Sequence, residues 1–277
     1  MKKTRTILFC LVIVIITSFS GCSIIDDTMV KLGFRNEDFN YIKENKIDKI
    51  IIQSARDAGF SFVVTDTNAI SDIYDILKKG SICSEKTSLD TDYVFEIHIG
   101  DEVKKYNYVV YLDDKGVGNF YDDNKAYKIS NNLDETILQN LSFVRKPRDF
   151  EAVYYDSILK VLDLKKESLN TGDNKVGIDI AGDVDCLKYM FSVDLETFKK
   201  EINDKINGTE LINNNAAEFN TIITVKNKGY SSKVFKTTIT VDDRVNKVYE
   251  TYYIQCNYEY KNWNINISEP NEKPANW

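Results

Sequence analysis

Four successive segments near the end of the chain alternate apolar and polar residues, and this alternation constrains the fold more than any other feature. A period of two places neighbouring side chains on opposite faces of a strand. Turn-forming residues separate the segments at 227–229, 242–243 and 261–262. The pattern therefore predicts a long antiparallel sheet with one buried face. Its predicted strands cover residues 219–225, 235–241, 248–258 and 263–267.

The region before this sheet has a helical period instead. Apolar residues recur three and four positions apart over 150–162 and again over 195–206, with a short β-rich run at 176–180 between them. Helices followed by a long sheet predict an α+β domain over residues 149–268, in which a curved antiparallel sheet wraps the helices. Residues 269–277 form a polar tail.

The first half of the chain predicts a second α+β domain, over residues 47–145. A helical pattern follows two short β-rich runs, with Asp66 or Asn68 placed to cap the helix and Gly80 to end it. A Tyr-rich antiparallel meander comes next, and Asn131 or Asn132 then caps a last helix. The predicted strands are 47–54, 60–65, 93–99, 106–112, 117–121 and 126–130, and the helices are 70–77 and 133–141.

The boundary between these domains is predicted at Pro147, in the charged segment 145–149. Residues 22–46 are polar and weakly patterned, and we interpret them as a stalk or linker. The expected fold class is α+β, with two domains that are each an antiparallel sheet with packed helices.

Two resemblances accompany this fold. Residues 47–143, with the segment Asp92-Tyr93-Val94-Phe95 and the alternating run 106–112, resemble the YhfM-like domains of uncharacterised Gram-positive lipoproteins. The ending at 258–267, an aromatic strand, a turn, Trp263 and then alternating Ile, loosely resembles cystatin-like and nuclear-transport-factor-2-like folds. Neither resemblance implies catalytic residues, and fold analogy does not establish function.

The N-terminal residues 1–21 have the features of a secretory signal. Three basic residues precede an apolar run over 7–19, and small residues follow it. A helix of that run rises only about 20 Å at 1.5 Å per residue, which is too short for a hydrocarbon core about 30 Å thick. The run is therefore typical of a removed signal rather than of a membrane span.

A cysteine directly follows the small residues. The segment Phe19-Ser20-Gly21-Cys22 resembles the lipobox of bacterial lipoproteins, although the family prefers an aliphatic residue where Phe19 stands. The resemblance implies that Cys22 receives a diacylglycerol, which holds the protein at the outer face of the cytoplasmic membrane. Two acyl chains anchor stably where one does not. An ordinary cleaved signal with an incidental cysteine is the alternative.

The charge balance excludes one class of partner. With 36 basic and 43 acidic residues, the net charge of −7 gives no cationic surface for nucleic-acid phosphates. We expect the partners to be membrane lipid, through Cys22, and a protein or small molecule of the envelope.

The sequence contains few candidates for catalytic or metal-binding residues. His98 is the single histidine and is expected on the solvent side of a strand. Ser157 and Lys160 form a Ser-x-x-Lys match without its companion motifs, and we interpret it as an ordinary helix face. No zinc pattern, cofactor motif or EF-hand is found. A weak calcium site at Asp113, Asp114, Asp122 and Asp123 is the alternative to simple turn capping.

Three cysteines remain in the expected mature chain, Cys83, Cys186 and Cys256. We expect buried free thiols, with a Cys186–Cys256 bridge as the alternative. Tyr249 and Tyr253 lie on the strand face opposite the predicted core, where they form a candidate binding surface. High strand propensity of tyrosine explains the same pattern without a ligand.

Two function classes stay open. One is a non-enzymatic, membrane-tethered binding or interaction module. The other is an extracytoplasmic hydrolase of envelope material that uses carboxylates as acid and base.

Overall fold

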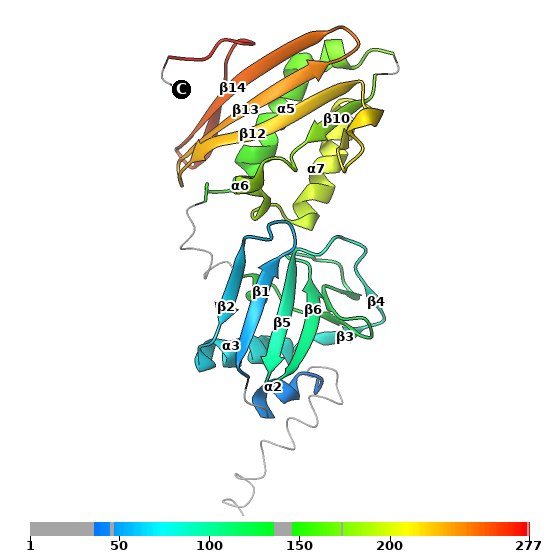
Figure 1. Ribbon diagram of the computed structural model, residues 1–277, viewed down its shortest axis with the longest axis vertical. Helices are drawn as coiled ribbons and strands as arrows, with labels where there is room; N and C mark the ends of the chain where they lie inside the picture. Colours follow the sequence, from blue (N-terminus) through cyan, green and yellow to red (C-terminus); the bar gives the residue numbers. More distant parts are fainter. Residues whose placement is uncertain (1–35, 45–46, 136–145, 173, 276) are drawn as a thin grey trace, which may run out of the picture.

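The computed structural model describes residues 36–44, 47–135, 146–172, 174–275 and 277. Two main sheets follow one another along the long axis of the molecule, and helices pack on each (Figure 1). The α+β fold class predicted from the sequence is confirmed. Among the described residues, no helix combines the length and the apolar character that crossing a membrane requires.

The first sheet has seven strands in the order β2-β1-β5-β6-β8-β9-β3, and every neighbouring pair is antiparallel. A separate parallel pair joins β4 to β7. The meander predicted from the Tyr-rich alternation is present, although the run predicted at 117–121 is divided between two strands. The strands are β1 (Lys49–Ser54), β2 (Ser61–Val64), β3 (Ser81–Cys83), β4 (Glu85–Lys86), β5 (Tyr93–Ile99), β6 (Glu102–Tyr108), β7 (Val117–Gly118), β8 (Phe120–Tyr121) and β9 (Ala126–Lys128).

Helices α2 (Asn40–Glu44) and α3 (Thr67–Leu77) pack on this sheet. The Asp66 carboxylate accepts a hydrogen bond from the Ala69 amide at 2.9 Å, so Asp66 is the N-cap. Phe39, which lies just before α2, is fully buried among Tyr106, Phe120 and Tyr127. The part of the stalk region that the structure describes therefore packs against the first core.

The second sheet has six strands in the order β11-β10-β12-β13-β14-β15. The strands from β12 to β15 form the predicted antiparallel sheet, but β10 pairs in parallel with both β11 and β12. The sheet is therefore mixed rather than wholly antiparallel. The helical crossover after β10 brings the chain back in the same direction. The strands are β10 (Val176–Asp179), β11 (Glu210–Leu211), β12 (Thr221–Tyr230), β13 (Val234–Asp243), β14 (Val248–Glu259) and β15 (Asn262–Ile267).

Helix α5 (Phe150–Leu169) packs against β13, β14 and β15, and α7 (Ser192–Lys205) packs beside α5. Figure 1 shows α5 crossing behind the strands of the second sheet. Their apolar faces share one core with the inward side chains of the strands. The short helices α6 (Val184–Leu187) and η1 (Ala216–Glu218) complete this part of the chain.

Two of the predicted turns lie elsewhere in the structure. The turn predicted at 227–229 is a β-bulge inside β12, where Gly229 has a φ of +126°. The chain turns after β12 instead, where the Ser231 hydroxyl accepts from the amides of Lys233 and Val234. The turn predicted at 242–243 comes after Asp243, whose carboxylate accepts from the amides of Val245 and Asn246.

Phe191 and Ser192, at the start of α7, contact the first sheet. The Phe191 ring is 5.8 Å from the Tyr111 ring and belongs to the first core. The Ser192 amide donates to Asp92 at 2.8 Å, and Arg56 donates to both Asp92 and Ser192. The two sheets therefore share a buried, charged contact. The domain boundaries drawn from the sequence stay a prediction, and most of the helix predicted at 133–141 lies outside the described residues.

Candidate binding surface

The sequence singled out Cys22, Tyr249 and Tyr253 as site residues. Cys22 lies outside the described residues. Both tyrosines are on β14, at positions whose side chains point away from α5. Tyr249 is 65% exposed, whereas Tyr253 is half-buried. The predicted exposed tyrosine surface thus contains one open ring and one partly covered ring.

Ser268 and Trp277, which follow β15, partly cover Tyr253. The backbone of Tyr253 exchanges hydrogen bonds with Ser268, and Asn271 bonds in the same way to Thr251, so the segment continues the edge of the sheet beyond β15. The Trp277 ring then packs edge-on against Tyr253, with 4.9 Å between the ring centroids. The predicted polar tail is therefore folded onto β14 at these residues, which gives the sheet an aromatic pair.

The face of the second sheet that carries these tyrosines is polar, and we call it the outer face. Antiparallel partners point to the same side, so the register defines its rows across the strands. One row is Thr224, Thr240 and Thr251, in which the Thr240 and Thr251 hydroxyls lie 3.2 Å apart. The next positions on this face are Lys226, Thr238, Tyr253, Lys236, Gln255, Asn266, Asn257 and Asn264.

Four carboxamide side chains form one end of the outer face, and we call them the amide patch. Gln255 pairs with Asn266 and Asn257 pairs with Asn264 across β14 and β15. Asn264 and Asn266 are exposed, and the other two are half-buried. Within the described part of the chain, none of the four amides has a hydrogen-bond partner. The patch therefore presents unused donors and acceptors to solvent.

An open cleft of about 780 Å³ lies on the other side of β14, between α5 and the residues that follow β15. Lys165 holds the Glu250 carboxylate at 2.8 Å, and the Tyr252 hydroxyl donates to the same carboxylate at 2.9 Å. These bonds, that from Lys165 first, hold the pKa of Glu250 below its usual range. Glu250 is therefore ionised near neutral pH and is not suited to act as a general acid.

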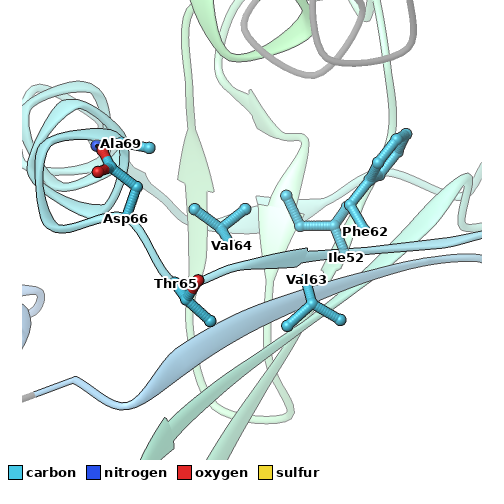
Figure 2. Close-up of a pocket in the computed structure, with 7 residues that line it drawn as sticks. All are labelled: Ile52, Phe62, Val63, Val64, Thr65, Asp66 and Ala69. Carbon is cyan, nitrogen blue, oxygen red and sulfur yellow. Dashed lines mark hydrogen bonds between the residues drawn. The ribbon is translucent and has the colours of Figure 1, made fainter. Parts of the chain in front are cut away.

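A smaller cleft of about 310 Å³ lies beside the edge strand β2. Figure 2 shows Ile52, Phe62 and Val64 on one side of the strand pair and Val63 on the other. The Asp66 carboxylate at its rim already caps α3. The cleft is thus mainly apolar, with little polar chemistry to orient a ligand.

The carboxyl groups whose pKa is raised by burial do not line either cleft. Burial raises the pKa of Asp134 to about 6, and Asp134 accepts from the Tyr108 hydroxyl and the Tyr111 amide. Burial likewise raises the pKa of Asp183, which accepts from the Tyr154 hydroxyl. Each of these two groups serves a buried hydrogen-bond network.

The other residues that the sequence analysis considered contact protein groups close by in the fold. His98 lies 3.5 Å from Glu96 on the face of β5 opposite the core. The Ser157 hydroxyl is buried and donates to the Val153 carbonyl, while Lys160 is exposed. Asp122 accepts from the Asn124 and Lys125 amides, as expected for turn capping.

The calcium alternative gains no support, because the described residues contain no cluster of three or more His, Cys, Asp or Glu that could hold a metal ion. The three cysteines are free, as predicted. Cys186 and Cys256 are buried, whereas Cys83 is only half-buried.

The comparison with protein families bears on the first sheet. The model of the family described as YhfM protein matches residues 43–147, a range that contains every strand of this sheet. Residues 43–147 form a YhfM domain. No curated protein and no solved structure matches the chain. The cystatin-like likeness of the second sheet accordingly stays a resemblance of sequence pattern.

Sequence reasoning missed two features of the structure. The amide patch has a readable signal, because Asn262, Asn264 and Asn266 alternate with the inward residues of β15. The contact of the YhfM domain with α7 has no signal in the sequence. Arg56, Asp92 and Ser192 are far apart in the sequence, and no pattern links residues at such separations.

Proposed function

We propose that the protein is a lipid-anchored binding module of the cell envelope. Cys22 carries the diacylglycerol that holds the chain at the outer face of the cytoplasmic membrane. The outer face of the second sheet binds the partner, and no bond is made or broken.

The observation that carries this proposal is the free hydrogen-bonding capacity of the outer face. Most polar side chains in a folded protein bond to backbone or water, and flat rows of them on a sheet form a stiff surface. Here four amides lie next to the Tyr253–Trp277 pair with no partner among the described residues. A ligand that covers such a surface replaces the water bound to these amides with directional hydrogen bonds of its own.

The state of the carboxyl groups supports binding over the hydrolase alternative. A carboxylate hydrolase needs one group that stays protonated beside its substrate. In the cleft beside α5, the lowered pKa of Glu250 works against that role. Asp134 and Asp183, whose pKa values are raised, are buried in hydrogen bonds instead. Burial also raises the pKa of Asp194 to about 6, but Asp194 lines neither of the two clefts.

A cell-based crosslinking scan tests the binding face. A photoreactive residue at Thr251 lies on the outer face, and one at Glu201 lies on an exposed position of α7, on the other side of the same sheet. We expect a discrete adduct from position 251 and none from 201. Equal adducts from both positions, or an adduct from 201 alone, would contradict the proposal.

The anchor is tested separately. Wild-type protein should incorporate labelled fatty acid and fractionate with membranes, because two acyl chains hold it there. Cys22→Ala should lose the label and leave the membrane fraction. Cys83→Ala, at a half-buried cysteine, is the matched control and should behave as the wild type. A Cys22→Ala protein that kept both properties would refute the anchor.

A further inference from the structure

The amide patch has the chemistry of a carbohydrate site. Each carboxamide has two N–H donors and one carbonyl acceptor, so the four side chains offer both kinds of group in a small area. Sugar hydroxyls also donate and accept. Neighbouring strands are about 5 Å apart, and side chains two positions apart on one strand are about 7 Å apart. The patch therefore has about the dimensions of one sugar ring.

An aromatic surface adjoins the amides. Tyr253 is two positions before Gln255 on the same face of β14, and the Trp277 ring packs against it at 82°. Both rings are half-buried, and the Lys273 ammonium lies over the Trp277 ring, 5.3 Å from its centroid. The exposed parts of the pair present a stiff and partly apolar area. The C–H face of a sugar ring can pack on such an area while its hydroxyls reach the amides.

The charges on and around the amide patch indicate which class of ligand it binds. The four amides are neutral, and the chain as a whole carries a net charge of −7. Lys236 neighbours Gln255 across the strands, Lys273 lies against the Trp277 ring, and Glu259 neighbours Asn262 at the end of the hairpin. Charges of both signs therefore border the site. The net negative charge of the chain repels a polyanion, and the amides themselves carry no charge that would attract one. A neutral chain suits the patch better.

We propose that the amide patch and the Tyr253–Trp277 pair bind a neutral polysaccharide. This inference rests on the proposed binding function and assigns its ligand class. The glycan lies along β15, with one sugar over the aromatic pair and its hydroxyls bonded to Asn264 and Asn266.

The test is a calorimetric titration of the full-length protein in detergent. The probe is a soluble hexamer of β-1,4-linked N-acetylglucosamine, and polygalacturonate is the anionic comparison. We expect saturable binding of the neutral hexamer and none of the polyanion. In the double variant Asn264→Ala/Asn266→Ala, Kd should rise about tenfold or more, since at least two hydrogen bonds are lost.

Matched variants separate this site from general effects. Asn207→Ala/Asn213→Ala removes two exposed asparagines that are outside the outer face and should leave Kd unchanged. Tyr253→Phe keeps the ring and should bind within about twofold of wild type, whereas Tyr253→Ala should weaken binding about tenfold. A circular dichroism melt of each variant confirms that it is folded.

Several outcomes would overturn the inference. The inference fails if the hexamer shows no saturable binding, or if Asn207→Ala/Asn213→Ala weakens binding as much as Asn264→Ala/Asn266→Ala. It also fails if the protein binds the polyanion, or an extended peptide in a parallel titration, more tightly than the hexamer. If the hexamer fails to bind while crosslinking from Thr251 persists, the binding function stands and the carbohydrate assignment falls. If both fail, the proposed function falls as well.

Discussion

The contribution of Glu250 to the stability of the fold should depend on pH. Its carboxylate is about four-fifths buried and accepts from Lys165 and Tyr252, which lowers its pKa below the value of 4.5 for a free Glu. A group with a lowered folded-state pKa stabilises the fold above that value, and the stabilisation is lost as the pH falls through the folded pKa.

Glu250→Gln should therefore lower the free energy of unfolding by about 1 kcal/mol at pH 7, because a partly buried, hydrogen-bonded ion pair is lost. The difference from wild type should shrink as the pH falls below 4.5. Urea titrations at pH 7 and pH 3.5 measure it. Glu196→Gln, in an exposed pair with Lys199, should change stability by less than about 0.5 kcal/mol. A pH-independent difference for Glu250→Gln would contradict this assignment.

At the residue scale, the sequence predicted roles that depend on near neighbours. Asp66 was named as one of two caps for α3, and it bonds to an amide three residues away. The capping of Asp122 was predicted on the same local grounds. Roles that depend on distant partners were not predictable. Nothing in the sequence around Asp92 points to Ser192, yet the Asp92 carboxylate accepts a hydrogen bond from the Ser192 amide, 100 residues away.

Strand β12 shows where element prediction fails. The segment Asn227-Lys228-Gly229 has the composition of a hairpin turn, but the strand continues through it with a bulge. Glycine permits either conformation, so local chemistry alone does not decide between them. The parallel pairing of β10 was missed for a related reason, since a lone short strand carries no record of its partner's direction.

The bulge gives a prediction for Gly229. Its φ of +126° is one that residues with a Cβ rarely adopt, so Gly229→Ala should destabilise the protein by about 1 to 3 kcal/mol. Gly182→Ala is the matched control, because its added Cβ approaches Asp179 only to 4.0 Å and its φ is ordinary. That variant should stay within about 0.5 kcal/mol of wild type. Chemical denaturation measures the free energy of unfolding of both variants. If Gly229→Ala were as stable as Gly182→Ala, the bulge would not require glycine.

At the scale of the whole molecule, Phe191 connects the two sheets. Its neighbours along the chain, Met190 and Phe198, belong to the second core. The Phe191 side chain, however, is only 7% exposed and packs in the first core. Phe191→Ala should therefore cost about 3 kcal/mol. It should also separate thermal unfolding into two transitions, because the cores lose the side chain that couples them. Leu164→Ala, at a position 62% exposed, should melt as the wild type. A single unshifted transition for Phe191→Ala would contradict this role.

The whole-molecule organisation was partly predictable from the sequence. Hydrophobic periodicity predicted two sheets with helices, and the YhfM resemblance matched the first of them. The contact between the sheets and the packing of Ser268, Asn271 and Trp277 on β14 depend on tertiary structure, which periodicity does not encode.

The central claim is that the outer face of the second sheet is the surface in contact with a partner on the cell. Cysteine accessibility measures this most directly. Asn264→Cys and Glu201→Cys are introduced one at a time in a Cys83→Ala background, because Cys83 is a free and only half-buried thiol. Both positions are exposed, one on the outer face and one on α7. In purified protein a maleimide should label both equally. On intact cells, the account predicts that position 264 is shielded while position 201 still reacts, and equal labelling of the two on cells would contradict it.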